Sequence, residues 1–346
     1  MRSIRVKTTT EYDVRVGAGL LSSCGETLRA LLPDCRKVML VSDTTVAALY
    51  ASRAETALAS AGFSVSRFVF SPGEASKTPE TLVALLQAAA EKGLARSDAF
   101  VALGGGVVGD IAGLAASLYQ RGCAYMQIPT TLLSAVDASV GGKTAVDLPC
   151  YKNYIGSFWQ PVAVLVDTEL FSTLPSEIFR QGMAEAIKTA LLAGFLLRVG
   201  SLSLENLIYE AVSYKAKIVA KDEQDHGSRR LLNLGHTIAH AIEERSAYSI
   251  PHGEAVSMGL SAVLRASSAN GKCGADLVGN VERQLIAAGL PTTLPCPMDE
   301  LIPYLSTDKK RMGERLTVIV PYGEGDCRSE EMILDEAAAF FRVTEA

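Results

Sequence analysis

Three of the four histidines in this 346-residue chain lie between positions 236 and 252. His236 and His240 are separated by three residues, and His252 begins the segment His-Gly-Glu. Positions i and i+4 of a helix lie on one face, so His236 and His240 would place two imidazoles together. Two imidazoles suit zinc or a similar divalent ion, which needs a third ligand and an open position to be catalytic. The cluster therefore predicts a metal site.

The residues around these histidines decide between a metal site and an ordinary helix. An isolated pair of histidines at this spacing is more often solvated or packed in a core than metal-bound. Here Arg229 and Asn233 precede the pair, and an apolar segment upstream carries Glu185 and Lys188 one helical turn apart. Polar groups on apolar helices are costly to bury unless they are paired or used. Their number favours a functional site.

A glycine-rich loop follows a predicted strand and opens a predicted helix. Gly104, Gly106 and Gly109 satisfy the pattern G-x-G-x-x-G, in which backbone amides approach a pyrophosphate at a helix N-terminus. A tight strand-to-helix junction would have the same glycines. In a standard dinucleotide-binding unit the loop follows the first strand, whereas here Asp43 ends the first strand of the predicted sheet and the loop follows the third. We expect a dinucleotide bound by a different α/β topology.

Other polar loops belong to the same predicted sheet. The segment Pro72–Lys77 follows the second strand and Thr130 follows the fourth, at the edge where open sheets bind ligands. The quartet at 141–144, Gly-Gly-Lys-Thr, lacks the upstream glycine of a nucleotide triphosphate loop, because that position is Asp137. Lys143, Lys152 and Asn153 suit contacts to a small phosphate, although each lysine taken singly fits a solvated surface position better.

The hydrophobic pattern predicts two domains. Residues 36–167 alternate short apolar runs with helical segments, at 36–43, 64–70, 98–106, 124–129 and 162–167, which is typical of a parallel-rich sheet covered on both faces. From residue 176 onward a period of 3.6 dominates, and only the segment LTVIVP is strand-like. We predict an α/β domain over 1–174 and an all-α domain over 175–346.

Composition narrows the classes of function. The formal charge of −5 and the pI near 5.6 exclude nucleic acid as the main partner, because phosphate neutralisation needs a basic face. The first residues lack the apolar core of a signal peptide, and the longest apolar stretch, 190–197, is too short to span a bilayer. Seven scattered cysteines without a CxxC pair fit reduced thiols. We expect a cytoplasmic protein with no membrane partner.

The motifs and their order resemble the 3-dehydroquinate synthase family. The resemblance rests on GGGVVGD, RG at 121–122, PTTLL, VDASVGGKT, KN at 152–153, AEAIK, KAKIVAKDE, RRLLNLGHTIAHAIE, PHGEAV and DKK at 308–310. It covers nearly the whole chain and is specific, since a dozen separated polar residues occur together. The family fold that it implies, an NAD-binding α/β domain followed by a metal-binding α-helical domain, agrees with the division made from periodicity.

The resemblance also implies the site residues. It implies Glu185, His236 and His252 as the ligands of Zn²⁺ or Co²⁺. His240 is then expected beside the metal and not as a ligand, which corrects the expectation that His236 and His240 both bind it. For NAD it implies Asp43, Glu74, Lys77, Gly105, Gly106, Asp110, Thr130, Thr131, Lys143, Lys152 and Thr173. For the substrate it implies Asp137, Lys143, Asn153, Lys188, Lys215, Arg229, Asn233 and His240, with Lys309 or Lys310 from a late loop. Arg121 is expected to reach the site of a partner subunit in a homodimer.

The implied reaction converts 3-deoxy-D-arabino-heptulosonate 7-phosphate to 3-dehydroquinate and phosphate, a step of the shikimate pathway to aromatic amino acids. It proceeds by transient oxidation by NAD, phosphate elimination, re-reduction, ring opening and aldol cyclisation. The segment 147–151, Asp-Leu-Pro-Cys-Tyr, departs from the usual Asn-His-Pro stretch, and Ile238-Ala239 from an aromatic residue and glycine. Three alternatives stay open: a sister sugar-phosphate cyclase, a metal-dependent dehydrogenase of the glycerol type, and an inactive NAD-binding or structural protein.

Overall fold

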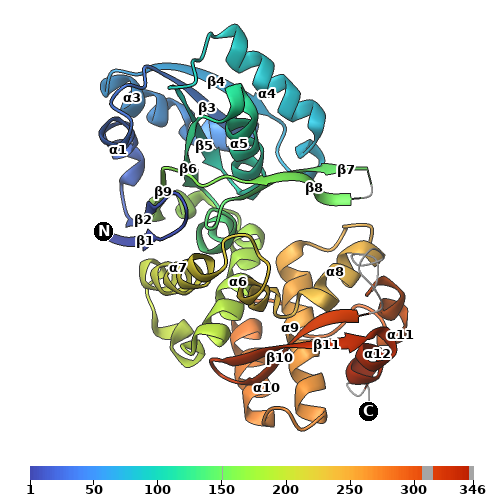
Figure 1. Cartoon of the computed structure of the whole chain (residues 1–346). Helices are drawn as coiled ribbons and strands as arrows, with labels where there is room; N and C mark the ends of the chain where they lie inside the picture. Colours follow the sequence, from blue (N-terminus) through green and yellow to red (C-terminus); the bar gives the residue numbers. More distant parts are fainter. Residues whose placement is uncertain (150, 306–314, 343–346) are drawn as a thin grey trace. The chain divides into compact units, whose positions relative to one another are not determined.

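The structure is a computed structural model that describes residues 1–149, 151–305 and 315–342. The chain divides into two compact units (Figure 1). Unit 1 comprises residues 1–175 and 204–224, and unit 2 comprises residues 176–203 and 225–346. The predicted domains differ from these units over residues 204–224, which the prediction places in the second domain and the structure in unit 1. Lys309 and Lys310 lie outside the described residues.

Unit 1 is built on a seven-stranded sheet in the order β1-β2-β9-β6-β5-β3-β4. The strands are β1 (Arg2–Val6), β2 (Tyr12–Gly17), β3 (Lys37–Asp43), β4 (Ser64–Phe70), β5 (Ala99–Gly104), β6 (Ala124–Pro129) and β9 (Ala163–Asp167). β1 pairs antiparallel with β2, and every other pair is parallel. This confirms the five predicted strands. Asp43, however, ends the third strand of the chain, because β1 and β2 join the same sheet.

Helices cover both faces of this sheet (Figure 1). They are α1 (Cys24–Leu31), α2 (Thr44–Val46), α3 (Ser52–Ser60), α4 (Pro79–Glu91) and α5 (Gly106–Leu118). Successive residues of β3 point to opposite faces, as strand geometry requires. Val38 and Leu40 pack in a cluster with residues of α1 and α3, whereas Met39 and Val41 pack with residues of α4 and α5. Each such buried side chain stabilises the fold by roughly 1.5–3 kcal/mol.

Unit 1 contains two features that periodicity did not assign to it. One is the antiparallel hairpin of β7 (Lys143–Leu148) and β8 (Tyr151–Phe158). The other is α7 (Leu204–Lys221), which belongs to this unit. The guanidinium of Arg2 on β1 stacks 4.8 Å from the ring of Tyr209, and Glu223, just beyond α7, accepts hydrogen bonds from the backbone and hydroxyl of Thr9. A helical period reveals an amphipathic helix but not which sheet it will cover.

Unit 2 is mainly helical, with α6 (Ser176–Ala193), α8 (His236–Arg245), α9 (His252–Ala269), α10 (Ala275–Ala287), α11 (Met298–Leu301) and α12 (Leu334–Arg342). Most of α9 is buried, and α6, α8 and α10 pack against it. The all-α prediction is wrong in one respect, since β10 (Arg315–Gly323) and β11 (Asp326–Ile333) form an antiparallel hairpin. Sequence LTVIVP lies in β10. β11 exposes most of its residues and so carries no buried strand pattern.

The six cysteines among the described residues are free thiols. Burial raises the pKa of Cys24 and Cys123 to about 12, so these two stay protonated and unreactive at neutral pH. Among the described residues, no helix combines the length and the apolarity needed to cross a membrane.

Candidate metal centre and cofactor site

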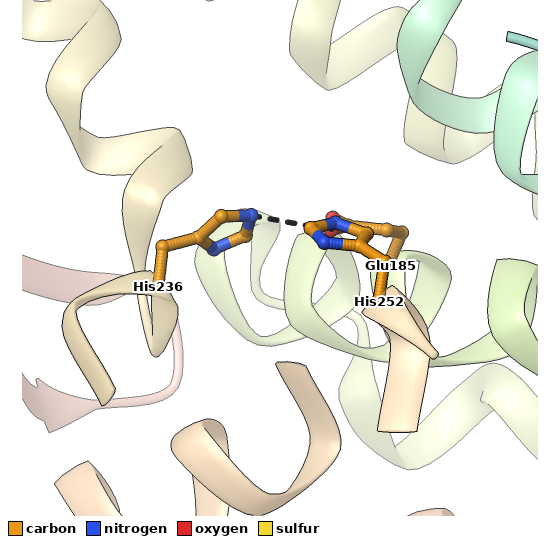
Figure 2. A group of neighbouring side chains, drawn as sticks. All are labelled: Glu185, His236 and His252. Atoms are coloured by element: carbon orange, nitrogen blue, oxygen red, sulfur yellow. Dashed lines mark hydrogen bonds and ion pairs between the residues drawn. The ribbon is translucent and has the colours of Figure 1, made fainter. Parts of the chain in front are cut away.

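Three helices of unit 2 bring one carboxylate and two imidazoles together (Figure 2). Glu185 lies on α6, His236 is the first residue of α8 and His252 is the first residue of α9. Oε1 of Glu185 lies 3.4 Å from Nε2 of His236 and 3.2 Å from Nε2 of His252. Ligands placed about 2.0–2.1 Å from a tetrahedral zinc ion are separated by about 3.3 Å. The donor types and their spacing therefore fit a divalent metal with an open fourth position.

His240 stands beside this group and is not part of it. Its ring centroid lies 5.4 Å from that of His236, as expected for neighbours one turn apart, and its side chain is exposed. The spacing of His236 and His240 thus predicted a shared helix face correctly. The pairing of two ligands from one helix was wrong, because Glu185 and His252 from other helices complete the group.

Close helix packing holds the ligand-bearing residues in register. Gly235, with φ of 79°, precedes α8, and a Cβ built on Gly259 of α9 would lie 2.2 Å from its carbonyl oxygen. On the other side of α9, the backbone N–H of Gly253 donates to Oε1 of Gln181 at 2.6 Å. Gln181 lies one turn before Glu185 on α6. These contacts fix α8 against the middle of α9, at Gly259, and α6 against its start, at Gly253.

Charge at the centre is buried and balanced. Burial alone would raise the pKa of Glu185, but the Lys188 ammonium 2.5 Å from Oε2 and the two imidazoles hold that pKa well below its usual range. Burial disfavours charged His252, but hydrogen bonds to Glu185 and Glu243 outweigh burial and raise its pKa to about 10. Glu185 is 1% exposed and Lys188 2% exposed. A carboxylate buried this deeply is kept ionised by its cationic neighbours.

Two residues that support the centre were not predicted from the sequence: Glu243, which contacts His252, and Gln181, which binds the backbone N–H of the next residue, Gly253. Glu243 is 4% exposed on α8, and its Oε1 lies 3.3 Å from Nδ1 of His252. The available signal was an acidic residue directly after the apolar residues Ile238, Ala239, Ala241 and Ile242, whose side chains are all buried. An acid at such a position requires a partner. Gln181 gave no comparable signal, because its partner is a backbone amide distant in sequence.

The remaining predicted residues of unit 2 lie on the segment before α8. Arg229 is 3% exposed in the 3₁₀ helix Ser228–Asn233, and Asn233 ends that helix with an exposed side chain. A buried guanidinium needs an anionic or hydrogen-bonding partner, and its planar fork is suited to a carboxylate. The structure thus provides one buried and one exposed polar group immediately before the metal centre in the sequence.

In unit 1, the glycine loop lies at the carboxyl end of β5, as predicted. Gly104 ends the strand, Gly105 is the N-cap of α5 and Gly106 is its first helical residue. A Cβ on Gly105 would lie 3.2 Å from Cγ2 of Thr131. The neighbouring hydroxyl of Thr130 is buried and has no hydrogen-bond partner within the described part of the chain. Free helix-end amides beside an unsatisfied hydroxyl fit a phosphate of a dinucleotide.

A buried network links residues predicted for NAD with one predicted for the substrate. Lys77, 5% exposed, lies 2.6 Å from Asp110 and donates a short hydrogen bond to Oδ1 of Asn153. Burial raises the pKa of Asp110 to about 6, and Lys77 opposes that rise. Lys152 lies 3.8 Å from Glu74 at the rim of the same group.

Asp147, the first residue of the segment that departs from the usual family stretch, takes part in this network. Asp147 accepts a hydrogen bond of 2.6 Å from the backbone N–H of Asn153, which has a positive φ of 54°. The backbone N–H of Asp147 donates to the carbonyl oxygen of Lys77 at 2.8 Å. Asp147 thereby stabilises a backbone conformation that asparagine tolerates better than most residues. The altered loop therefore still holds Asn153 beside Lys77.

The other predicted residues of unit 1 form separate local groups. Lys215 on α7 donates to the carbonyl oxygen and to Oδ1 of Asp137, at 2.6 and 2.7 Å. Asp43 caps α2 by accepting from the N–H of Val46, and Thr173 makes a short hydrogen bond to Tyr50. Lys143 begins β7 with an exposed side chain, and Thr131 accepts a hydrogen bond from the N–H of Ser134.

Arg121 lies in a strained turn after α5. It has a φ of 66°, follows Gln120 with a φ of 48°, and its side chain is exposed. Non-glycine residues in this region are uncommon, and such strain persists where the surrounding structure imposes it. Within the described ranges, the guanidinium makes no hydrogen bond or ion pair.

Comparisons with known proteins identify the family. Residues 67–181 match the family profile described as 3-dehydroquinate synthase N-terminal, and residues 182–311 match the C-terminal one. The chain is 42% identical to a 3-dehydroquinate synthase of Caulobacter vibrioides over 91% of this chain and 90% of the relative. It is 40% identical to that of Latilactobacillus sakei, covering 92% of each.

Solved structures of related enzymes share this fold. A 2-deoxy-scyllo-inosose synthase with carbaglucose-6-phosphate, NAD⁺ and Co²⁺ matches with a TM-score of 0.85 and 25% identity over 99% of each chain. The 2-epi-5-epi-valiolone synthase of Streptomyces hygroscopicus subsp. jinggangensis, with NAD⁺ and Zn²⁺, matches at 0.84 and 27% over 100% of each. A probable glycerol dehydrogenase of Sinorhizobium meliloti shares only the fold, at 0.65 and 16% over 96% of each. The chain belongs to the 3-dehydroquinate synthase family.

Proposed function

We propose that this protein converts 3-deoxy-D-arabino-heptulosonate 7-phosphate to 3-dehydroquinate and phosphate. One observation carries the proposal: a carboxylate and two imidazoles meet at metal-ligand spacing in a chain that is 42% identical to a curated 3-dehydroquinate synthase. The free cysteines support a reducing, cytoplasmic location.

Two bound groups would supply the chemistry that side chains cannot. A divalent ion, Zn²⁺ or Co²⁺, held by Glu185, His236 and His252 would supply Lewis acidity toward a substrate hydroxyl, and NAD would accept and return a hydride. The NAD residues that we propose lie along the carboxyl edge of the sheet and beside it, and are Asp43, Glu74, Lys77, Gly105, Gly106, Asp110, Thr130, Thr131, Lys143, Lys152 and Thr173. The unsatisfied hydroxyl of Thr130 supports this assignment.

The chain's own residues would bind and orient the acidic substrate. Arg229 is suited to the carboxylate because a guanidinium can bind both of its oxygens. Lys143 and Asn153 would hold the phosphate, with Asn153 positioned by Lys77 and Asp147. Lys188 keeps Glu185 ionised and therefore able to act as a ligand.

Polar groups beside the metal ligands would transfer protons. The exposed imidazole of His240, next to His236, and the amide of Asn233 would relay or orient a proton. Lys215 is held by Asp137, which fixes the direction of its ammonium. This fixed pair would contact a substrate oxygen.

We also propose a homodimer in which Arg121 completes the phosphate pocket of the partner. The exposed guanidinium on a strained turn supports this role, because a side chain held outward at a cost in backbone energy is available to an external anion. The sequence resemblance provides the expectation of a second subunit.

Phosphate release tests the proposal directly. Purified protein with the heptulosonate phosphate, NAD and Zn²⁺ should release phosphate, and removal of metal by a chelator should abolish release. Addition of Zn²⁺ or Co²⁺ to the stripped protein should restore it. Release at the full rate from protein shown to hold no metal would contradict the metal-dependent mechanism. Glycerol should not reduce NAD under the same conditions, which separates this enzyme from a polyol dehydrogenase.

A further inference from the structure

Glu243 is a buried carboxylate that has no role in the reaction as proposed above. It lies on α8 with 4% of its surface exposed, between Ile242, which is 1% exposed, and the end of the helix. An ionised carboxylate in such a position is costly unless it is paired and hydrogen-bonded. It contacts the imidazole of His252, with Oε1 and Nδ1 separated by 3.3 Å.

This contact assigns different tasks to the two nitrogens of His252. Nδ1 faces Glu243, while Nε2 lies 3.2 Å from Glu185 in the metal group. When Nδ1–H donates a hydrogen bond to the carboxylate, Nε2 keeps its lone pair available for a metal held by the three ligands. His236 has the same arrangement with a neutral partner, since its Nδ1 lies 3.2 Å from the carbonyl oxygen of Leu234.

Helix geometry explains the placement of Glu243. His236, His240 and Glu243 occur at positions i, i+4 and i+7 of α8 and therefore share one face. The helix contributes a ligand at its first residue and, about two turns later, an acid that reaches the first residue of α9. Close contact between Gly235 and Gly259 keeps the two helices near enough for this reach.

We propose that Glu243 is a positioning residue for the metal centre, which fixes the tautomer and ring orientation of His252 and raises its strength as a ligand. This inference rests on the proposed function of Glu185, His236 and His252 as metal ligands. Outer carboxylates of this kind commonly change metal affinity by about 10- to 100-fold. A carboxylate is a stronger acceptor than the Leu234 carbonyl, so His252 is the ligand whose strength depends most on its outer partner.

The test compares Zn²⁺ affinity in matched variants by equilibrium competition with a chromophoric chelator. Glu243→Gln removes the charge and keeps the shape, so we expect affinity to fall about 10-fold, and Glu243→Ala to lower it about 100-fold. Glu244→Gln is the control, because it makes the same change at the next position of α8, whereas the carboxylates that His252 contacts in the described part of the chain are Glu185 and Glu243. Unchanged far-UV circular dichroism and NAD affinity would show that the fold is kept.

The outcomes separate this inference from the metal assignment. If wild type and Glu244→Gln bind Zn²⁺ and Glu243→Gln binds it equally well, the role of Glu243 is wrong and the metal site stands. If wild type binds no Zn²⁺ at all, both fail. A second measurement does not depend on any variant: ¹⁵N-histidine NMR of the zinc-loaded wild type should show a slowly exchanging proton on Nδ1 of His252. An unprotonated Nδ1 would overturn the proposal.

Discussion

At the residue scale, the metal centre depends on ligands from three helices rather than on one histidine pair. We expect His252→Ala to lower bound zinc from about one ion per chain to a small fraction, because two remaining donors seldom hold a catalytic ion. His240→Ala should retain the metal, since its imidazole lies outside the group. Metal analysis after dialysis checks both. Loss of zinc in His240→Ala together with retention in His252→Ala would restore the histidine pair as the site.

The buried pair Lys77 and Asp110 gives a second prediction. In the NAD-free protein, Asp110 should titrate at about 6, above its ordinary value of 3.8, because burial outweighs the Lys77 ammonium. Between these two pH values the folded chain binds more protons at this group than the unfolded chain. Its contribution to the free energy of unfolding therefore decreases as pH rises through that window.

Side-chain ¹³C NMR of labelled aspartates measures this titration. Lys77→Met should raise the pKa of Asp110 further, because it removes the ammonium that favours the carboxylate. Lys152→Met is the control, since Lys152 pairs with Glu74 instead. A lower pKa in Lys77→Met than in wild type would show that the pair is not formed as described.

Motifs indicated residues that the structure brings together at the metal centre, but they did not indicate residues that act through contacts between helices. Glu185, His236 and His252 were implied by resemblance, and the structure brings them together. Glu243 and Gln181 were missed, because their roles come from contacts across helices. The hydrogen bond from Lys77 to Asn153 joins residues 76 positions apart, which spacing along a chain does not reveal.

At the scale of elements, the approach of α8 to α9 limits side-chain size at Gly259. A Cβ at this position would lie 2.2 Å from the Gly235 carbonyl oxygen and 2.9 Å from the amide nitrogen of Ala239. We expect Gly259→Ala to destabilise the protein by about 1–3 kcal/mol and to weaken Zn²⁺ binding, because backbone must move and His236 moves with it.

Gly279→Ala is the matched control, a helical glycine on α10 where the nearest atom to a new Cβ is the far end of Arg283 at 3.4 Å. This change should stabilise by roughly 0.5–1 kcal/mol through helix propensity. Urea unfolding and zinc competition measure both variants. A neutral Gly259→Ala with unchanged zinc affinity would mean that the two helices are not held together by this contact.

Strands and helices could be predicted from the sequence where burial imposes a clear hydrophobic period. β3 and β5 are buried almost throughout and appeared as apolar runs between turn residues. β8 and β11 expose most of their residues, so their sequences do not alternate and neither was predicted. The assignment of α7 to the helical domain failed because its apolar face fits either a sheet or a helix bundle.

At the scale of the whole molecule, the proposed shared site predicts complementation between inactive chains. Arg121→Ala and Lys143→Ala homodimers should each be inactive. A mixture that has exchanged subunits should regain about one quarter of wild-type activity, because half of the dimers are hybrids with one intact site. Phosphate release measures the recovery, and native mass spectrometry confirms exchange. No recovery after complete exchange would argue that Arg121 serves its own subunit.

The fate of the nicotinamide tests the central claim most directly, because a cyclase returns its hydride and a dehydrogenase does not. Protein, metal, the heptulosonate phosphate and a limiting amount of NAD would be followed simultaneously by reduced-nicotinamide absorbance and by released phosphate. Our account predicts many phosphates released per NAD, with no build-up of NADH. Stoichiometric accumulation of NADH, with phosphate-free polyols oxidised equally well, would contradict it and identify a polyol dehydrogenase.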